Sequence, residues 1–411
     1  MLDGRAGEAA RLAMNILVEM AGVAEADRFI EVTCAHIDGG LYHGRAGLDF
    51  AERLATAGAR VAVPTTLNVS SLDLLHPDLY RGDPDTAAAA RRLMDFYVAM
   101  GCRPSWTCAP YQLPERPSFG EQIAWAESNA IVFANSVLGA RTERYGDFID
   151  ICAAITGRVP DAGLHRDENR AGAILYQLTG VPDRLLESDA LYPVLGHLIG
   201  AETGTSVPVI AGLPRATSED RLKALGAAAA SSGAVAMFHA IGVTPEAPTA
   251  QDAFHGRLPL RTVEVTPERL VAVRDVLSTV SDGPLAAVSV GTPHASAAEL
   301  DELSHLMGDG RVNSGIDFFV STGRDVLAQA EKAGTAARLR DAGVQIVVDT
   351  CTYITPILRP TPGAVMTNSA KWAYYAPGNI GVDVVFGSTE ECVRSAIAGR
   401  IWRDDGLWLE A

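Results

Sequence analysis

The strongest constraint on the fold is the alternation of apolar runs and helix-like segments in the last two-fifths of the chain. The runs LAAVSVG, IDFFVST, VQIVVDT and VDVVFGS are almost continuously apolar, and amphipathic segments separate them. Continuously apolar strands are typical of parallel sheets that helices cover on both faces. The pattern therefore predicts an α/β protein with mainly parallel sheets flanked by helices.

Other segments carry weaker versions of the same patterns. The predicted helices lie near residues 1–22, 83–100, 120–137, 171–178 (after a polar loop), 218–233, 266–280, 295–308 and 324–343, and the predicted strands lie near 29–34, 61–63, 207–213 and 234–242. Ser296 and Ser388 each stand three residues before a glutamate, which is the pattern of a capping box at a helix start.

Length and composition limit the function. With 411 residues, 48% of them hydrophobic, the chain can bury a large core. We treat residues 1–411 as one body, and the Pro/Gly-rich segment 242–262 is the one hint of an internal boundary. The net charge of −16 argues against nucleic acid or anionic membranes as partners. Neither a signal peptide nor an apolar run of ~18 residues is evident, so a cytoplasmic protein is expected.

Three predicted strands end in residues that carry chemistry. Cys351 follows VQIVVDT, His294 follows LAAVSVGTP, and Ser369 and Lys371 follow AVMT. Parallel strands end at one edge of a sheet, where ligands bind, so these side chains are expected to converge. The six cysteines include no C-x-x-C pair. Buried thiols, a nucleophile and dispersed iron ligands all remain open.

The segment 106–160 is dense in polar side chains suited to binding. Asn135 and Ser136 precede a glycine-containing turn, and Arg141 and Thr142 follow it. Arginine in such a setting is suited to bidentate binding of a carboxylate or phosphate. The alternative interpretation is an ordinary loop with a solvated arginine.

Two earlier strand ends also carry polar residues. His36 and Asp38 stand before a glycine pair, and Thr65, Thr66 and Asn68 follow the apolar residues 61–63. Their predicted place at the carboxyl ends of strands makes them candidate substrate ligands. A surface turn with a capping aspartate is the alternative.

Several phrases resemble the aconitase X family, a branch of the aconitase superfamily of iron-dependent hydro-lyases. They are AHIDG, VPTTLNVSSLD, TCAPY, AWAESNA, NSVLGARTERYGDF, AAITGRVP, GTPHAS, DTC and TNSAKWAYYAPGN, and they extend over nearly the whole chain. The resemblance implies an aconitase-like catalytic body with its site between domains. It also implies a dehydratase in which iron acts as a Lewis acid on the leaving hydroxyl group.

The resemblance implies cysteine ligands for an iron–sulfur cluster. Cys108 and Cys351 match, whereas Gly40 and Thr292 stand where family members carry a further cysteine, so Cys34 is the candidate third ligand. A [2Fe–2S] cluster is favoured over [4Fe–4S], and a single iron stays open. By the same resemblance Lys371, Ser369 and His294 are candidate catalytic residues.

Two substrates are consistent with the resemblance. The phrases favour cis-3-hydroxy-L-proline, which would yield Δ1-pyrroline-2-carboxylate, and phosphomevalonate is the alternative. A silent binding subunit is a further alternative, and a thiol hydrolase using Cys108 or Cys351 with His294 ranks last. The swivel domain of aconitases is expected to be absent from this chain and supplied by a separate small subunit. Without it, an exposed cleft is expected around Cys108, Cys351, Arg141 and Lys371.

Overall fold

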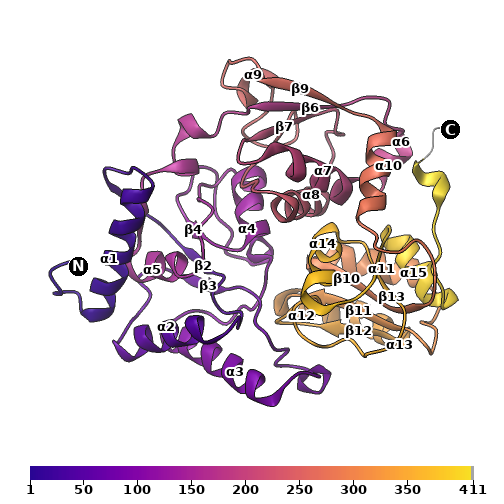
Figure 1. Ribbon diagram of the computed structural model, residues 1–411, viewed down its shortest axis with the longest axis horizontal. Helices are drawn as coiled ribbons and strands as arrows, with labels where there is room; N and C mark the ends of the chain where they lie inside the picture. The colour runs from indigo at the N-terminus through magenta and orange to yellow at the C-terminus, as the bar shows by residue number, and fades with distance from the viewer. Residues whose placement is uncertain (409–411) are drawn as a thin grey trace.

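The computed structural model describes residues 1–408, in which three α/β parts pack around a common centre (Figure 1). We call residues 1–169 the N-terminal part, 172–276 the middle part and 285–398 the C-terminal part. Each part has a parallel sheet of its own. The predicted fold class, mainly parallel sheets flanked by helices, is confirmed.

The C-terminal part matches its predicted alternation closely. Its parallel sheet has the order β12-β11-β10-β13-β14. The strands are β10 (Leu285–Ala295), β11 (Asp317–Thr322), β12 (Val344–Val347), β13 (Ala364–Thr367) and β14 (Val384–Phe386), and the helices are α11 (Ala297–Met307), α12 (Arg324–Lys332), α13 (Thr335–Asp341), α14 (Ala370–Ile380) and α15 (Thr389–Ala398). Both predicted capping boxes are present, at Ser296 and Ser388. The single helix predicted at 324–343 is two helices, because Gly334 takes a left-handed conformation between them.

The middle part contains the parallel sheet β8-β7-β6-β9. Its elements are β6 (Ile174–Leu178), α6 (Asp183–Glu187), α7 (Leu191–Thr203), β7 (Pro208–Ala211), α8 (Glu219–Ser232), β8 (His239–Ala240), α9 (Ala250–Ala253), β9 (Arg261–Val265) and α10 (Pro267–Val276). The helix predicted at 171–178 was wrong, because ILYQL forms β6 with alternating burial. The segment 242–262 connects β8 to β9 within this sheet.

The N-terminal part is built on the short parallel sheet β3-β2-β4, beside the antiparallel pair β1-β5. Its elements are α1 (Glu8–Val23), β1 (Phe29–Glu31), β2 (Ala35–Ile37), α2 (Arg45–Thr56), β3 (Thr65–Leu67), α3 (Pro84–Ala99), β4 (Ala124–Trp125), α4 (Ser128–Phe133), the π-helical turn η3 (Ala134–Leu138), α5 (Ile149–Thr156) and β5 (Arg158–Pro160). Short 3₁₀ turns are η1 (Pro77–Leu79), η2 (Pro110–Gln112), η4 (Gly163–His165), η5 (Asp167–Asn169) and η6 (Asp405–Trp408).

Two predictions fail in the N-terminal part. The strand expected at 61–63 lies at Thr65–Leu67, so the predicted polar loop residues Thr65 and Thr66 are in the strand. The helix expected at 120–137 begins at Ser128, because residues 124–125 pair with β2. Tertiary pairing decides these short segments, which local patterns cannot reveal.

One apolar cluster joins all three parts. It includes Val69 and Cys108 from the N-terminal part, Tyr176 from the middle part, and Cys351 and Trp372 from the C-terminal part. Separate clusters fill the N-terminal and C-terminal parts. The two cysteines therefore lie where the parts meet. Within the described residues, no helix has the length and apolar character needed to cross a membrane.

Candidate active site

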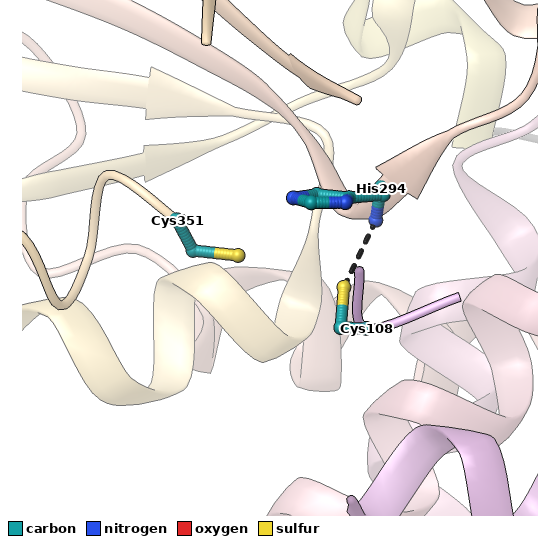
Figure 2. Close-up of side chains that lie close together, drawn as sticks. All are labelled: Cys108, His294 and Cys351. Atoms are coloured by element: carbon teal, nitrogen blue, oxygen red, sulfur yellow. Dashed lines mark hydrogen bonds between the residues drawn. The ribbon is translucent and has the colours of Figure 1, made fainter. Parts of the chain in front are cut away.

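Cys108, His294 and Cys351 come together between the N-terminal and C-terminal parts (Figure 2). One ligand atom from each residue lies within 4.8 Å of those of the other two. All three side chains are buried. In Figure 2 the Cys351 sulfur points toward Cys108, with the imidazole beside both. A hydrogen bond from the Cys351 thiol to the Cys108 sulfur, followed by burial, raises the pKa of Cys351 well above its ordinary value.

Strained backbone lies two residues before each cysteine. Trp106 has φ +43° and Asp349 has φ +64°, values that side chains other than glycine rarely adopt. Arg324 holds the buried Asp349 carboxylate with two hydrogen bonds of 2.6 Å. The backbone N–H of Leu74 donates to the same carboxylate at 3.1 Å. Such over-determined strain is concentrated at functional sites.

His294 is held on both sides of its ring. Its Nδ1 contacts the Thr107 hydroxyl at 3.1 Å, and its Nε2 contacts the Thr350 carbonyl oxygen at 3.1 Å. Burial lowers the pKa of His294 to about 4, so the ring is neutral, with the proton on Nε2. Its backbone N–H donates to the Cys108 sulfur at 3.2 Å. His294 therefore orients Cys108, and its own nitrogens already have partners.

Lys371 forms a buried ion pair with Glu127. Lys371 lies in the first turn of α14, and Glu127 caps α4 by accepting the Ala130 N–H at 2.9 Å. Burial disfavours the ammonium group, but the Glu127 carboxylate together with Tyr353 and Cys108 outweighs burial and raises the pKa of Lys371 well above its ordinary value. Lys371 therefore keeps its positive charge because of a partner that the sequence analysis did not assign.

Glu127 and Asn129 are site residues that sequence reasoning missed. Glu127 has φ +75°. The Asn129 amide donates to the Cys108 carbonyl oxygen at 2.9 Å and accepts from the Tyr111 hydroxyl at 2.6 Å. Both belong to the phrase AESNA, which was assigned to the middle of a helix. The available signal was an acidic residue next to Ser128, where a helix could begin.

Ser369 acts as a helix cap. Its hydroxyl accepts the Trp372 N–H at 3.1 Å, which fixes the start of α14 and so the place of Lys371. Ser369 also lines a small cavity of about 30 Å³ with Thr292, whose hydroxyl has no partner among the described residues.

The side chains predicted to bind a carboxylate are engaged elsewhere. Asn135 donates to the carbonyl oxygens of Thr142 and Ala236 at 2.9 and 3.0 Å. Ser136 accepts the Phe238 N–H at 2.9 Å, and Thr142 accepts the Trp125 N–H at 3.1 Å. These contacts tie the segment to its surroundings.

Arg141 lies in a different cavity from the thiols. That cavity has a volume of about 730 Å³ and includes Arg28, His165 and Asp167. Arg141 is ion-paired with Asp167. The expected exposed cleft was wrong, because Cys108, Cys351 and Lys371 are at most 5% exposed and Arg141 lines this other cavity.

Residues at the ends of β2 and β3 lie together. His36 is buried, and its Nδ1 contacts the Thr66 hydroxyl at 2.8 Å. Thr65 donates to the Val63 carbonyl oxygen at 2.8 Å. The Asn68 amide donates to the Asp38 carboxylate. Cys34 shares a cavity of about 310 Å³ with Thr65 and Thr66, and it does not belong to the group of Cys108, His294 and Cys351.

Family models match most of the chain. The aconitase X first domain matches residues 1–168, the second domain residues 172–275 and the third domain residues 285–398. These ranges follow the three parts closely.

Individual proteins are similar over nearly the full length. The chain is 46% identical to cis-3-hydroxy-L-proline dehydratase of Pseudomonas aeruginosa, over all of this chain and 70% of that protein. It is 33% identical to the phosphomevalonate dehydratase large subunit of Methanocaldococcus jannaschii, over 96% of this chain and 97% of that one. The crystal structure of aconitase X (holo-form) from Thermococcus kodakaraensis superposes with a TM-score of 0.86 at 33% identity, covering 96% and 97% of the two chains.

Proposed function

The chain belongs to the aconitase X family, and from that membership we propose that it dehydrates cis-3-hydroxy-L-proline. The observation that carries this proposal is the buried convergence of Cys108, His294 and Cys351 in a chain so similar to a named dehydratase of that substrate. A second relative with the same name, from Hypocrea jecorina, is 41% identical. Phosphomevalonate is the alternative substrate, since large subunits of phosphomevalonate dehydratases are 33–36% identical.

The donor set fits iron or an iron–sulfur group. Two thiols within 4.8 Å of one another are soft donors of the kind that iron–sulfur groups require. Cys108 and Cys351 would be the protein ligands. His294 would have to exchange a hydrogen bond to join them. So few converging donors favour a single iron or a [2Fe–2S] cluster over a [4Fe–4S] cluster. The bound group would supply Lewis acidity toward the leaving hydroxyl group.

Side chains and helix N-termini of this chain would set the electrostatic environment of the reacting groups. Lys371 keeps its proton on Nζ beside Glu127 and places a positive charge near the two thiols. Two N-terminal helix ends, those of α4 and α14, meet at this ion pair and add partial positive charge. We propose that this region holds negative charge on the substrate, while buried walls exclude water.

Arg141, with Asn135 and Ser136, stays a predicted carboxylate site. Arg141→Lys keeps the charge and loses the planar fork, so a role in the site predicts a large rise in KM. Unchanged kinetics would remove Arg141 from the substrate site and would indicate that it serves the ion pair with Asp167.

A swivel domain would complete the enzyme. We propose that it covers the thiol site and contributes a catalytic base, as a separate small subunit. Closure of this kind strengthens the electrostatics of a site and completes the set of catalytic groups. The relatives named large subunits support a two-chain arrangement.

The test is an assay of the anaerobically purified protein, with and without the candidate small subunit. Dehydration of cis-3-hydroxy-L-proline, with iron bound and no turnover of phosphomevalonate, is expected from the complex. Turnover of phosphomevalonate alone would select the alternative substrate. An iron-free protein inactive on both would identify a silent binding subunit.

A further inference from the structure

Building on the proposed function, we propose that Asp38 and Asn68 form the subsite for the ring ammonium group of the substrate. This subsite would select an amine-bearing hydroxy acid over a phosphorylated one.

The two residues meet because their strands are neighbours. Asp38 directly follows β2 and Asn68 directly follows β3, and the two strands pair in parallel. The Asn68 backbone N–H donates to the Ile37 carbonyl oxygen at 2.9 Å, which continues the pairing beyond the strands. The Asn68 side-chain amide donates to the Asp38 carboxylate. Both polar groups therefore lie at the carboxyl edge of this sheet, where α/β proteins bind ligands.

The side-chain oxygen of Asn68 is a buried acceptor. The side chain is 2% exposed, and its Oδ1 has no hydrogen-bond partner among residues 1–408. This oxygen is bonded to the same carbon atom as the nitrogen that contacts the Asp38 carboxylate. A buried acceptor without a partner is costly and calls for a donor. A ligand N–H would satisfy it.

The negative charge around Asp38 also favours a bound cation. Glu127, Asp147 and Asp150 all add negative charge around Asp38. Glu127 has Lys371 as its partner, whereas Asp38 has no ion-pair partner among the described residues. Burial, together with these carboxylates, raises the pKa of Asp38 to about 8. A bound cation would relieve this repulsion.

The residues that follow Asn68 link the subsite to the segments that carry the two thiols. Val69, next to Asn68, packs in the same apolar cluster as Cys108 and Cys351. The Ser70 N–H donates to the carbonyl oxygen of Asp349, two residues before Cys351, at 2.7 Å.

An organic ammonium group fits better than a metal ion or a phosphate. Within the described part of the chain, the carboxylates here do not form a group of three ligand atoms close enough for one ion. A phosphate would be repelled by the same carboxylates. A secondary ammonium group has two N–H donors, one for the Asp38 carboxylate and one for the Asn68 oxygen.

Two ligands with a five-membered ring, a carboxylate and similar size test the subsite. L-Proline carries the ammonium group, whereas the ring nitrogen of pyrrole-2-carboxylate is uncharged. Their dissociation constants are measured by calorimetry on the iron-loaded complex, for the wild type, Asp38→Asn and Asn68→Leu. The exposed Asp49→Asn on α2 is the matched control. Asp38→Asn retains an acceptor for Asn68, so the fold is expected to persist.

Asp38→Asn should raise the dissociation constant of L-proline about ten- to hundredfold, as expected for a lost charged hydrogen bond. The dissociation constant of pyrrole-2-carboxylate should rise by less than about twofold. Asn68→Leu should also weaken the binding of L-proline selectively, but by less than Asp38→Asn does. Asp38→Glu should bind L-proline more tightly than Asp38→Asn. Equal effects on both ligands, no effect, or no binding of L-proline to the wild type would overturn the subsite. If L-proline binds as expected and cis-3-hydroxy-L-proline is not dehydrated, the proposed function fails and the subsite stands.

Discussion

At the scale of single residues, Cys108 and Cys351 should be separately essential for iron binding. Serine keeps nearly the same size but is a poor ligand for iron–sulfur groups, so Cys108→Ser and Cys351→Ser should each lose most bound iron and the visible absorption. Iron analysis and absorption spectra after anaerobic purification measure this. Cys102→Ser and Cys392→Ser are matched controls, because both residues are buried outside the site. Full iron content in either site variant would contradict the assignment.

His165 should make the fold sensitive to acid. Burial, assisted by the charges of Arg170 and Arg141, lowers its pKa to about 4. Below about pH 6.5 the unfolded chain binds a proton that the folded protein does not, so stability is lost as the pH falls toward 4. Relative to wild type, His165→Gln should therefore gain about 2–3 kcal/mol between pH 7.5 and pH 4.5.

Urea unfolding at the two pH values measures this difference. The exposed His305→Gln serves as the control and should show no comparable gain. A free-energy difference between His165→Gln and wild type that stays constant with pH would argue against a neutral buried imidazole.

The two thiol residues could be predicted from the sequence, but the ion pair between Glu127 and Lys371 could not. Cys351 and His294 stand at strand ends, which the apolar runs reveal. The Glu127–Lys371 pair joins residues from different parts of the molecule, and only the packing of those parts brings them together. Arg141 was chosen for its chemistry, yet its position depends on where the turn after η3 directs it.

At the scale of elements, replacing either of two helix-capping serines should lower stability, but only one of the two replacements should also lower activity. Ser369 and Ser388 both accept an N–H in the first turn of their helices, α14 and α15. Replacing either with alanine should lower the free energy of unfolding by about 1 kcal/mol. Only Ser369→Ala should also lower kcat/KM clearly, because α14 carries Lys371. Urea titrations and steady-state kinetics check this, and an equal loss of activity in Ser388→Ala would refute it.

Elements with long, regular patterns are well predicted, and short ones are not. The C-terminal strands bury both faces, so each reads as a continuous apolar run. By contrast β4 has two residues and β3 has three, too few for any periodicity. The wrong helix at 120–137 follows from this, since pairing with β2 overrides the local preference.

At the scale of the whole molecule, removal of iron should loosen the contact between the N-terminal and C-terminal parts. Several bonds join the parts near Cys351, among them Val348 N–H to Asp73 at 3.0 Å. Chelation should increase hydrogen exchange in residues 106–110 and 349–355 several-fold, because ligand binding stabilises the joined state. The strands β6 and β7 of the middle part are the internal control. Equal deprotection of all regions would point to global destabilisation instead.

The arrangement of the three parts lay beyond sequence patterns. Periodicity predicts each parallel sheet from its own residues, but the common apolar cluster draws residues from all three parts. Contacts between residues hundreds of positions apart leave no local signal, which is why the site's location between parts came from resemblance.

The separation of the proposed ligands Cys108 and Cys351 along the chain has a consequence for the insertion of the proposed iron group. Translation delivers Cys108 early and Cys351 late, and a metal site assembled from distant segments does not exist in the unfolded chain. An N-terminal part that folded during synthesis would contain only Cys108 of the two proposed ligands. With this pair of ligands, cofactor insertion would have to follow the synthesis of the C-terminal part, because fragments that end before Cys351 lack one of the two proposed ligands.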